Sequence, residues 1–248
     1  MKPETSAFLL DLNRRFYRDF GRAFAATRRR VQPGVMNAIE RLPGVGNWLD
    51  LGCGSGELAR SLDRAGYRGR YLGIDSSAEL LAEAPPDLAV RSDFSAIFRQ
   101  ADLAKSDWAE SLPLKTWEAI TCFAVLHHMP GIELRTRLLQ QIRLLLAEEG
   151  RLVHSVWQFQ HSPRLLERRI PWERVGLSTL DLEEGDTLLD WRYALPGQPE
   201  QVGLRYVHLF TQKELADLAT ACGFEILDEY ESDGAGGRLG LYQIWACG

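Results

Sequence analysis

The segment from Trp48 to Gly56, WLDLGCGSG, constrains the fold of this chain more than any other. A short apolar run, typical of a buried strand, ends in three glycines at alternate positions, and residues 57–65 follow with the pattern of a helix. Glycine is needed where a backbone turns tightly or approaches a ligand closely, because it tolerates positive φ. A helix that begins there directs free N–H groups and the positive end of its dipole at the turn. The segment therefore predicts a strand–turn–helix unit that binds a ligand.

Strands and helices alternate along most of the chain. Apolar runs predict strands at residues 47–51, 70–74, 97–101, 117–125 and 152–159, with helices at 57–65, from Ser76 or Ser77 to Ala84, and at 132–147. A helix at 211–222 and strands at 225–230 and 239–246, joined by a glycine-rich turn, predict an antiparallel C-terminal hairpin. This order predicts an α/β, Rossmann-like fold with a seven-stranded doubly wound sheet.

The length of 248 residues suits one domain, and we expect residues 1–248 to form it. Apolar residues at helical spacing predict an N-terminal helical arm over residues 1–43. Residues 160–210 are rich in Arg, Glu, Trp and Pro and lack clean periodicity. We therefore expect them to form a lid-like insertion over the C-terminal edge of the sheet.

Cysteine usage and hydropathy limit the class of protein. Four cysteines form no CxxC pair and no metal-binding spacing, so we expect a cytoplasmic protein with neither disulfides nor a metal site. No apolar run approaches the roughly 20 residues that a membrane helix needs. The N-terminal apolar stretch is also too short for a signal peptide.

The charge is distributed unevenly. The net charge is −5, which argues mildly against a protein that coats nucleic acid, yet residues 1–30 alone carry +5. Such a basic arm can hold a phosphate-bearing substrate, or it can be an ordinary solvated helix face. The sign of the charge does not decide between these interpretations.

Two acidic residues follow strands and match the needs of a nucleoside. Asp75 lies 19 residues beyond Gly56, where a carboxylate can bind both ribose hydroxyls, and Asp102 suits an adenine amino group. Residues 54–59 also match G-x-G-x-x-A, which a nicotinamide enzyme would share. Asp50 at the mouth of the turn would repel a pyrophosphate but attract the sulfonium and amine of S-adenosylmethionine (SAM). The series resembles the motifs of the class I SAM-dependent methyltransferases, which implies SAM as cofactor and a transferase activity.

The segment from Leu126 to Pro130, LHHMP, follows the fourth predicted strand. Many class I methyltransferases carry a similar histidine-containing stretch at the ligand-binding edge of the sheet. His127 or His128 could act as a general base, or both could pack at a helix start and form a wall of the cofactor pocket. Two adjacent histidines do not make a metal site without a third ligand.

Three further stretches resemble one subfamily, the eukaryotic wobble-uridine tRNA methyltransferases that esterify 5-carboxymethyluridine. They are residues 16–28 ending in Thr-Arg, residues 156–159 with 185–191, and residues 204–210 leading into 213–215. Together these stretches cover most of the chain, but only residues 204–210 are dense enough to be specific. The chain departs from the subfamily at Leu189-Asp190-Trp191, where members carry Val-Pro-Trp.

The resemblance implies that Arg28 lies near the cofactor carboxylate and that Arg205, Tyr206 and His208 face the substrate. A carboxylate is already ionised at neutral pH, so its methylation needs an arginine and in-line placement rather than a strong base. The alternative is that residues 205–208 form a strand edge that packs the insertion down.

Three kinds of methyl acceptor are compatible with the sequence: a tRNA, another modified nucleoside, or a small molecule methylated on O or N. A non-catalytic SAM-binding subunit is a further alternative, and a small activating partner protein is an added expectation. The predicted catalytic residues are Arg205, Tyr206, His208 and His127. The predicted cofactor-binding residues are Arg28, Asp50, Gly52, Cys53, Gly54, Gly56, Asp75, Ser76, Asp102, Leu103 and Phe123.

Overall fold

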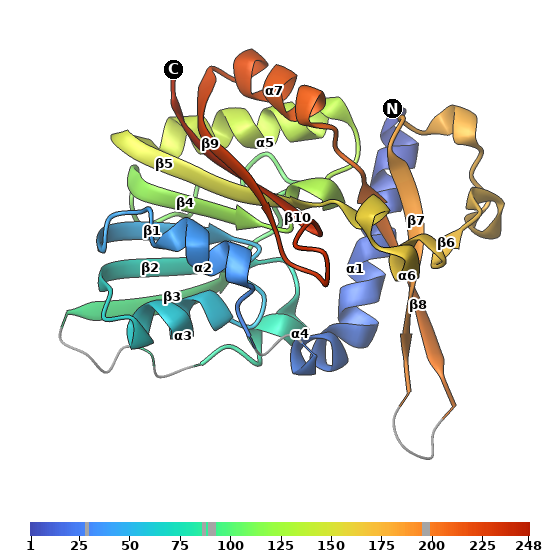
Figure 1. The fold of residues 1–248 in the computed structure, drawn as a ribbon, viewed down its shortest axis with the longest axis horizontal. Coiled ribbons are helices and arrows are strands. Elements are labelled where there is room, and N and C mark those ends of the chain that lie inside the picture. The colour runs from blue at the N-terminus through green and yellow to red at the C-terminus, as the bar shows by residue number, and fades with distance from the viewer. Residues whose placement is uncertain (28–29, 86–87, 89–92, 195–198) are drawn as a thin grey trace.

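The computed structural model describes residues 1–27, 30–85, 88, 93–194 and 199–248. Its central sheet has the strand order β3-β2-β1-β4-β5-β10-β9, with β1 to β5 parallel and β10 antiparallel to both of its neighbours (Figure 1). This arrangement confirms the predicted α/β fold and its C-terminal hairpin. The strands are β1 (Val45–Leu51), β2 (Arg68–Asp75), β3 (Phe94–Gln100), β4 (Trp117–Phe123), β5 (Leu146–Trp157), β9 (Phe224–Ser232) and β10 (Gly240–Cys247).

Helices cover both faces of the sheet, because the parallel strands are apolar on both sides. α5 (Ile132–Leu145) and α7 (Gln212–Ala221) pack on one face in a large core that includes Leu49 and Trp245. α2 (Pro33–Ile39) and α3 (Glu57–Arg64) pack on the other face around Trp48 and Tyr71. The sheet is therefore doubly wound, as predicted. The predicted helix that ends at Ala84 is shorter, since α4 spans Ala78–Leu81.

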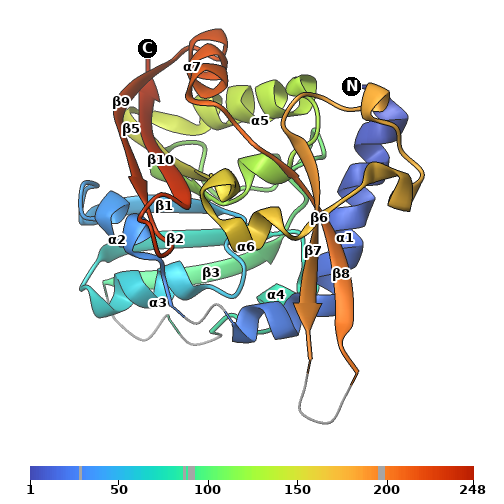
Figure 2. The same ribbon diagram turned by 45° about the vertical axis from the view of Figure 1, so that its right-hand side comes forward.

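The N-terminal segment forms one long helix, α1 (Pro3–Ala26), beside a second, smaller sheet. That sheet contains β6 (Arg169–Ile170), β7 (Asp186–Tyr193) and β8 (Gln201–His208), all antiparallel. Two short helical segments, η2 (Phe159–His161) and α6 (Pro163–Leu166), connect β5 to it, and η3 (Trp172–Val175) and η4 (Thr179–Asp181) lie between β6 and β7. A further short segment, η1 (Leu126–His128), follows β4 of the main sheet. Figures 1 and 2 both show α1 running alongside β8. Within the described residues, none of the helices combines the length and apolar character of a membrane span.

Sequence analysis did not predict β7, and it offered β8 only as the alternative of a strand edge at residues 205–208, because both faces of this small sheet are buried. Leu188 and Tyr206 pack against Leu9 of α1, while Leu189 and Val207 pack on the opposite face. Neighbouring residues on one strand are therefore both apolar, which removes the alternation expected of a half-buried strand.

Asn13 fixes α1 to the edge of β8. Its side-chain amide donates to the backbone carbonyl of Tyr206 at 3.1 Å, and its oxygen accepts from the Tyr206 backbone N–H at 2.9 Å. Asn13 is buried, so leaving either backbone group unsatisfied would cost roughly 1–3 kcal/mol. The helix thus completes the strand edge and holds β8 over the end of the main sheet.

Candidate active site

A cavity of about 750 Å³ lies at the carboxyl ends of the parallel strands, beneath α1 and the second sheet. The strand order reverses between β1 and β4, and ligands of open α/β sheets bind at such a switch point. The cavity has two halves. The half at the ends of β1, β2 and β3 contains eight predicted cofactor residues, and a ninth, Phe123, lies at the end of β4. The eight are Asp50, Gly52, Cys53, Gly54, Asp75, Ser76, Asp102 and Leu103.

The glycine turn is shaped by positive φ angles. Gly52 has φ +74°, and a Cβ there would lie 2.3 Å from Cγ2 of Val125. Gly54 has φ +56°, but a Cβ there would meet nothing within 4 Å, because it would project into the cavity. Gly52 is therefore required by packing, whereas Gly54 leaves open a cradle in which a ligand can approach the backbone. Gly56 precedes α3 and is absent from the cavity lining.

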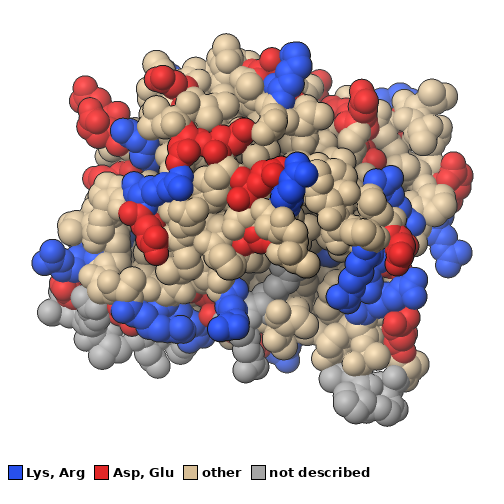
Figure 3. Space-filling view, viewed as in Figure 1, with Lys and Arg blue, Asp and Glu red and all other residues tan. Residues whose placement is uncertain are grey.

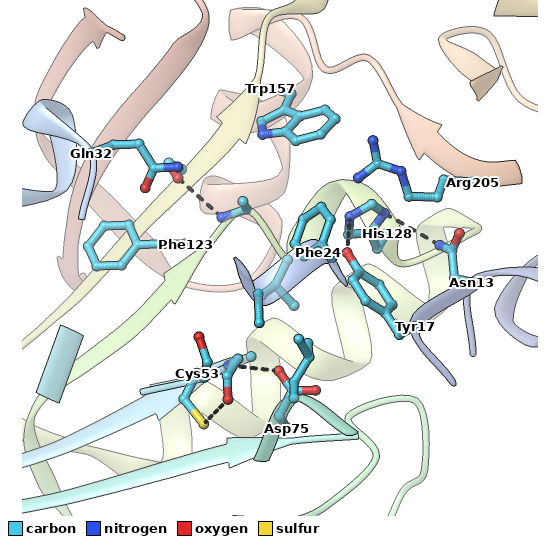
Figure 4. Close-up of a pocket in the computed structure, with 18 of the residues that line it drawn as sticks. Asn13, Tyr17, Phe24, Gln32, Cys53, Asp75, Phe123, His128, Trp157 and Arg205 are labelled. Carbon is cyan, nitrogen blue, oxygen red and sulfur yellow. Dashed lines mark hydrogen bonds between the residues drawn. The ribbon is translucent and has the colours of Figure 1, made fainter. Parts of the chain in front are cut away.

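Asp75 ties this turn to the end of β2. Its carboxylate accepts hydrogen bonds from the backbone N–H groups of Gly54 at 2.9 Å and Ser77 at 2.8 Å. Burial raises the pKa of Asp75, although these N–H donors oppose the effect. Figure 4 shows Asp75 beside Cys53 at the floor of the cavity. The carboxylate thus lies where ribose hydroxyls are expected, and it also stabilises the turn.

Asp50 lies at the end of β1 and accepts two side-chain hydrogen bonds. Thr121 donates to Oδ1 at 2.6 Å, and the Tyr71 hydroxyl donates to Oδ2. Burial raises the pKa of Asp50 to about 6, even though both donors favour the ionised form. A carboxyl group of this kind changes its charge just below neutral pH.

We expect the affinity for SAM to increase as the pH rises from about 5 to about 7. At pH 5 only about a tenth of Asp50 would be ionised if its pKa is near 6, and only the ionised form attracts the sulfonium and amine. Calorimetric titrations across this range measure the change, and the Asp50→Asn variant supplies the control with a flatter profile. If the affinity for SAM changed with pH equally in the wild-type protein and in Asp50→Asn, this role for Asp50 would be contradicted.

Asp102 is held by α1. Nη2 of Arg14 lies 2.8 Å from its Oδ2, while the Ala104 backbone N–H donates to Oδ1 at 3.0 Å. The first helix therefore covers the half of the cavity at the ends of β1, β2 and β3, which we call the cofactor half. It is also linked to the residue predicted to bind adenine. Arg28, predicted to lie near the cofactor carboxylate, falls outside the described residues.

Arg205 dominates the other half of the cavity (Figure 4). Its side chain comes from β8 and is 2% exposed. The guanidinium carbon lies 4.8 Å from the ring centre of Phe16, 5.1 Å from that of Trp157 and 5.5 Å from that of Phe24. Aromatic faces stabilise a cation at such distances. This half therefore presents a buried positive charge among flat apolar rings.

Further arginines line the rim of the same half. Arg168 and Arg192 both pair with the buried Asp190, at 3.3 Å and 2.8 Å, and Arg164 lies nearby on α6. Figure 3 shows Lys and Arg side chains gathered over α6 and the adjoining part of the β7–β8 hairpin. This half of the cavity is thus suited to a negatively charged, planar molecule.

The structure corrects the expectation that Tyr206 and His208 face the substrate. Successive side chains of a strand point to opposite faces, so Tyr206 and His208 point away from the cavity that Arg205 enters. The Tyr206 hydroxyl donates to Asp186 at 2.8 Å. His208 lies between Asp186 (Nδ1, 2.7 Å) and Glu214 (Nε2, 2.8 Å).

Arg135 lies at the centre of the charged cluster that contains Asp186, His208 and Glu214. It is 1% exposed and lies 3.0 Å from Glu183, 3.3 Å from Glu214 and 3.9 Å from Asp186. Glu183, Asp186 and His208 also place possible metal-ligating atoms within 4.8 Å of one another. Because Arg135 of α5 lies within ion-pair distance of all three carboxylates, we interpret the cluster as the ionic tie of the second sheet to α5 and α7.

The two histidines of η1 differ in position. His127 is fully buried and accepts a hydrogen bond at Nδ1 from the Trp157 backbone N–H, 3.3 Å away, and burial lowers its pKa well below the ordinary value. His127 is absent from the cavity lining, which corrects its prediction as a base, whereas His128 lines the cavity. His128 had been considered as a base or as a wall of the cofactor pocket, whereas the cavity residues that sequence analysis did not single out include Tyr17, Phe24, Trp157 and Trp191.

Comparison with known proteins decides the family. Residues 22–229 match the family described as a methyltransferase domain. The chain belongs to this family. It is 26% identical over 218 residues to a protein of Encephalitozoon cuniculi (strain GB-M1) whose name describes a methyltransferase, covering 86% of this chain and 87% of the relative.

Solved structures of methyltransferases share the fold of this methyltransferase. A SAM-dependent methyltransferase from Methanosarcina mazei has a TM-score of 0.59 at 24% identity, covering 88% of this chain and 98% of the other. DhpI, in a complex with SAM and HEP, has a TM-score of 0.63 at 22% identity, covering 96% of this chain and 97% of the other. The family and these neighbours support SAM as the cofactor of this methyltransferase.

Proposed function

We propose that this methyltransferase methylates a carboxylate oxygen of a planar acceptor, and that the acceptor is a 5-carboxymethylated uridine at the wobble position of a tRNA. The observation that carries the proposal is Arg205, a buried cation among aromatic rings in the half of the cavity opposite the glycine turn. The subfamily resemblance of residues 204–210 supports the same acceptor.

The cofactor half fits SAM. Gly54 leaves an open cradle at the turn, and the carboxylates of Asp50, Asp75 and Asp102 line the same space. These residues would hold the amine and sulfonium, the ribose and the adenine respectively. When bound, SAM supplies an electrophilic methyl group that leaves sulfur with the bonding electron pair remaining on sulfur.

The half of the cavity around Arg205, which we call the acceptor half, positions an anion for this transfer. The Arg205 guanidinium holds the ionised carboxylate by charge-assisted hydrogen bonds, and the ring of Trp157 lies beside the plane of the base. α1 and the second sheet cover the cavity and exclude water. Because the nucleophile is already ionised, alignment accounts for most of the rate enhancement.

A small-molecule acid is the second candidate acceptor. The net charge of the whole chain is −5, and residues 1–30 carry +5, so the rest of the chain has a net negative charge that opposes binding of a polyanion. Activity on a small carboxylic acid that does not change with salt concentration would favour this candidate. The predicted small activating partner and cytoplasmic location stay predictions.

The decisive experiment is mass spectrometry of tRNA nucleosides from a strain lacking the gene. We expect the free 5-carboxymethyl nucleoside to accumulate and its methyl ester to disappear, and the purified enzyme with SAM to restore the ester. Unchanged nucleosides would reject the tRNA acceptor. Failure to transfer labelled methyl groups to any acceptor would instead favour a non-catalytic SAM-binding subunit.

A further inference from the structure

Tyr17 and His128 meet at the wall of the acceptor half. The Tyr17 hydroxyl, from α1, lies 3.3 Å from Nε2 of His128, and both side chains line the cavity (Figure 4). Nδ1 of His128 lies 2.9 Å from the backbone carbonyl of Tyr206. The pair therefore joins three separate elements, α1, η1 and β8, at one point beside Arg205.

The contacts of His128 define its tautomer. Nδ1 lies 2.9 Å from the Tyr206 carbonyl, which only accepts hydrogen bonds, and 3.4 Å from Nδ2 of Asn13, which only donates. We assign the proton to Nδ1 on the shorter contact, so Nδ1 donates to the carbonyl. In the neutral ring Nε2 then has a lone pair and accepts from the Tyr17 hydroxyl. With its proton directed at His128, the Tyr17 oxygen has lone pairs that can accept a hydrogen bond from a molecule in the cavity.

We propose that Tyr17 and His128 form a proton relay that gives this methyltransferase a second class of acceptor, an anionic aromatic compound methylated on a hydroxyl or amino group. This inference rests on the proposed function, since it uses the same cofactor and the same Arg205. A carboxylate nucleophile has no proton to lose, so its methylation would not require the relay. A hydroxyl or amine nucleophile must lose one proton for each methyl group gained.

In this geometry the relay takes up the one proton that each methyl transfer releases. As the acceptor oxygen or nitrogen forms its bond to the methyl carbon, its hydrogen leaves as a proton to the Tyr17 oxygen. The Tyr17 hydroxyl proton passes at the same time to Nε2 of His128, which becomes an imidazolium. The relay returns this proton to solvent through Tyr17 when the product leaves, and no electrons are exchanged with another reagent.

Among the described residues, the groups that face His128 hold its orientation or influence its charge, with the Tyr206 carbonyl favouring the charged form and Arg205 the neutral form. These groups are Tyr17 and Asn13 from α1, Arg205 and the Tyr206 carbonyl from β8, Trp157 from β5, and the adjacent His127. Burial, with the Arg205 charge adding to it, lowers the pKa of His128 to about 4. Nε2 is therefore available as an acceptor at neutral pH.

The test separates the two classes of product by their stability in alkali. The full-length enzyme is incubated with SAM carrying a radiolabelled methyl group and with either total tRNA or a deproteinised small-molecule extract. Methyl esters are released by mild alkali, whereas ethers and N-methyl groups resist it. We expect wild-type enzyme to give alkali-resistant label, and Tyr17→Phe and His128→Asn to lower the ratio of alkali-resistant to alkali-labile label about 100-fold.

The variants have matched controls. His128→Asn keeps an N–H donor for the Tyr206 carbonyl while removing Nε2. Tyr67→Phe removes another buried tyrosine hydroxyl, which donates to the Gly46 carbonyl at 2.8 Å and lies outside the cavity lining, so it should leave the label unchanged. Label that is entirely alkali-labile in wild type would overturn the relay but keep the carboxylate proposal. An absence of label would overturn both.

Nitrogen NMR of the unliganded enzyme gives a second readout that does not depend on activity. With labelled histidine, the His128 ring should show a protonated Nδ1 and an unprotonated Nε2 from about pH 5 to about pH 8. Tyr17→Phe should alter the Nε2 resonance and leave Nδ1 protonated. A proton on Nε2 in the wild-type enzyme would overturn the relay, whatever the labelling shows.

Discussion

Replacing Arg205 with methionine should lower kcat/KM for the carboxylate acceptor by about 100-fold or more, which corresponds to roughly 3 kcal/mol. Methionine has similar length and packs well against the rings of Phe16 and Trp157, so the variant should fold. What it removes is the charge that holds the acceptor. The affinity for SAM should not weaken, because losing a nearby cation does not disfavour a sulfonium.

Two comparisons make this result specific. Arg205→Lys keeps a positive charge but loses the planar fork, so we expect it to recover only part of the activity. Arg169→Met removes another arginine that lies over an aromatic ring, 5.9 Å from the centre of Phe159 and outside the cavity lining, and should leave kcat/KM unchanged. Steady-state kinetics with SAM and tRNA measure all three variants. Wild-type kinetics in Arg205→Met would contradict the acceptor role of Arg205.

Replacing Gly54 with alanine should weaken SAM binding by about 100-fold, again roughly 3 kcal/mol. The added Cβ meets nothing within 4 Å in the protein, so it occupies the space in which the cofactor would approach the turn. The positive φ of +56° also strains an alanine, at a cost to stability of about 1–2 kcal/mol. The effect on binding should therefore exceed the effect on the free energy of unfolding.

Gly66 provides the matched control for this strain. It has φ +76°, and a Cβ there also meets nothing within 4 Å, but it lies outside the cavity lining. Gly66→Ala should lose similar stability in denaturant unfolding while binding SAM normally. If the two alanine variants bound SAM equally well, the turn at Gly54 would not form the cofactor cradle.

The cofactor half could be predicted because its residues follow consecutive strands. Asp50 and Asp75 lie at the carboxyl ends of β1 and β2, and Asp102 follows β3, so the alternation of strands and helices brings them to one edge. The glycines between them mark the turn directly. The contacts from distant parts of the chain, such as Arg14 with Asp102 and Thr121 with Asp50, hold these residues but are not needed to find them.

The acceptor half could not be assembled in the same way. Tyr17, His128, Trp157 and Arg205 come from four elements that only the tertiary fold brings together. Both His127 and His128 had been possible bases, and only His127 was placed among the predicted catalytic residues. The local pattern of a short helical segment does not say which of two adjacent side chains meets the cavity, and it is His128 that does. Tyr206 and His208 were misplaced because the subfamily resemblance directs all three residues to the substrate, whereas the alternative of a strand over residues 205–208 puts them on the face opposite Arg205.

The central claim is that the cavity at the ends of β1, β2 and β4 binds SAM. Isothermal titration of the purified chain tests it most directly. The structure and the family predict saturable binding of SAM, and of S-adenosylhomocysteine, with one site per chain, lost or severely weakened in Gly54→Ala and retained in Gly66→Ala. An absence of binding by both compounds to the folded wild-type protein would contradict the account.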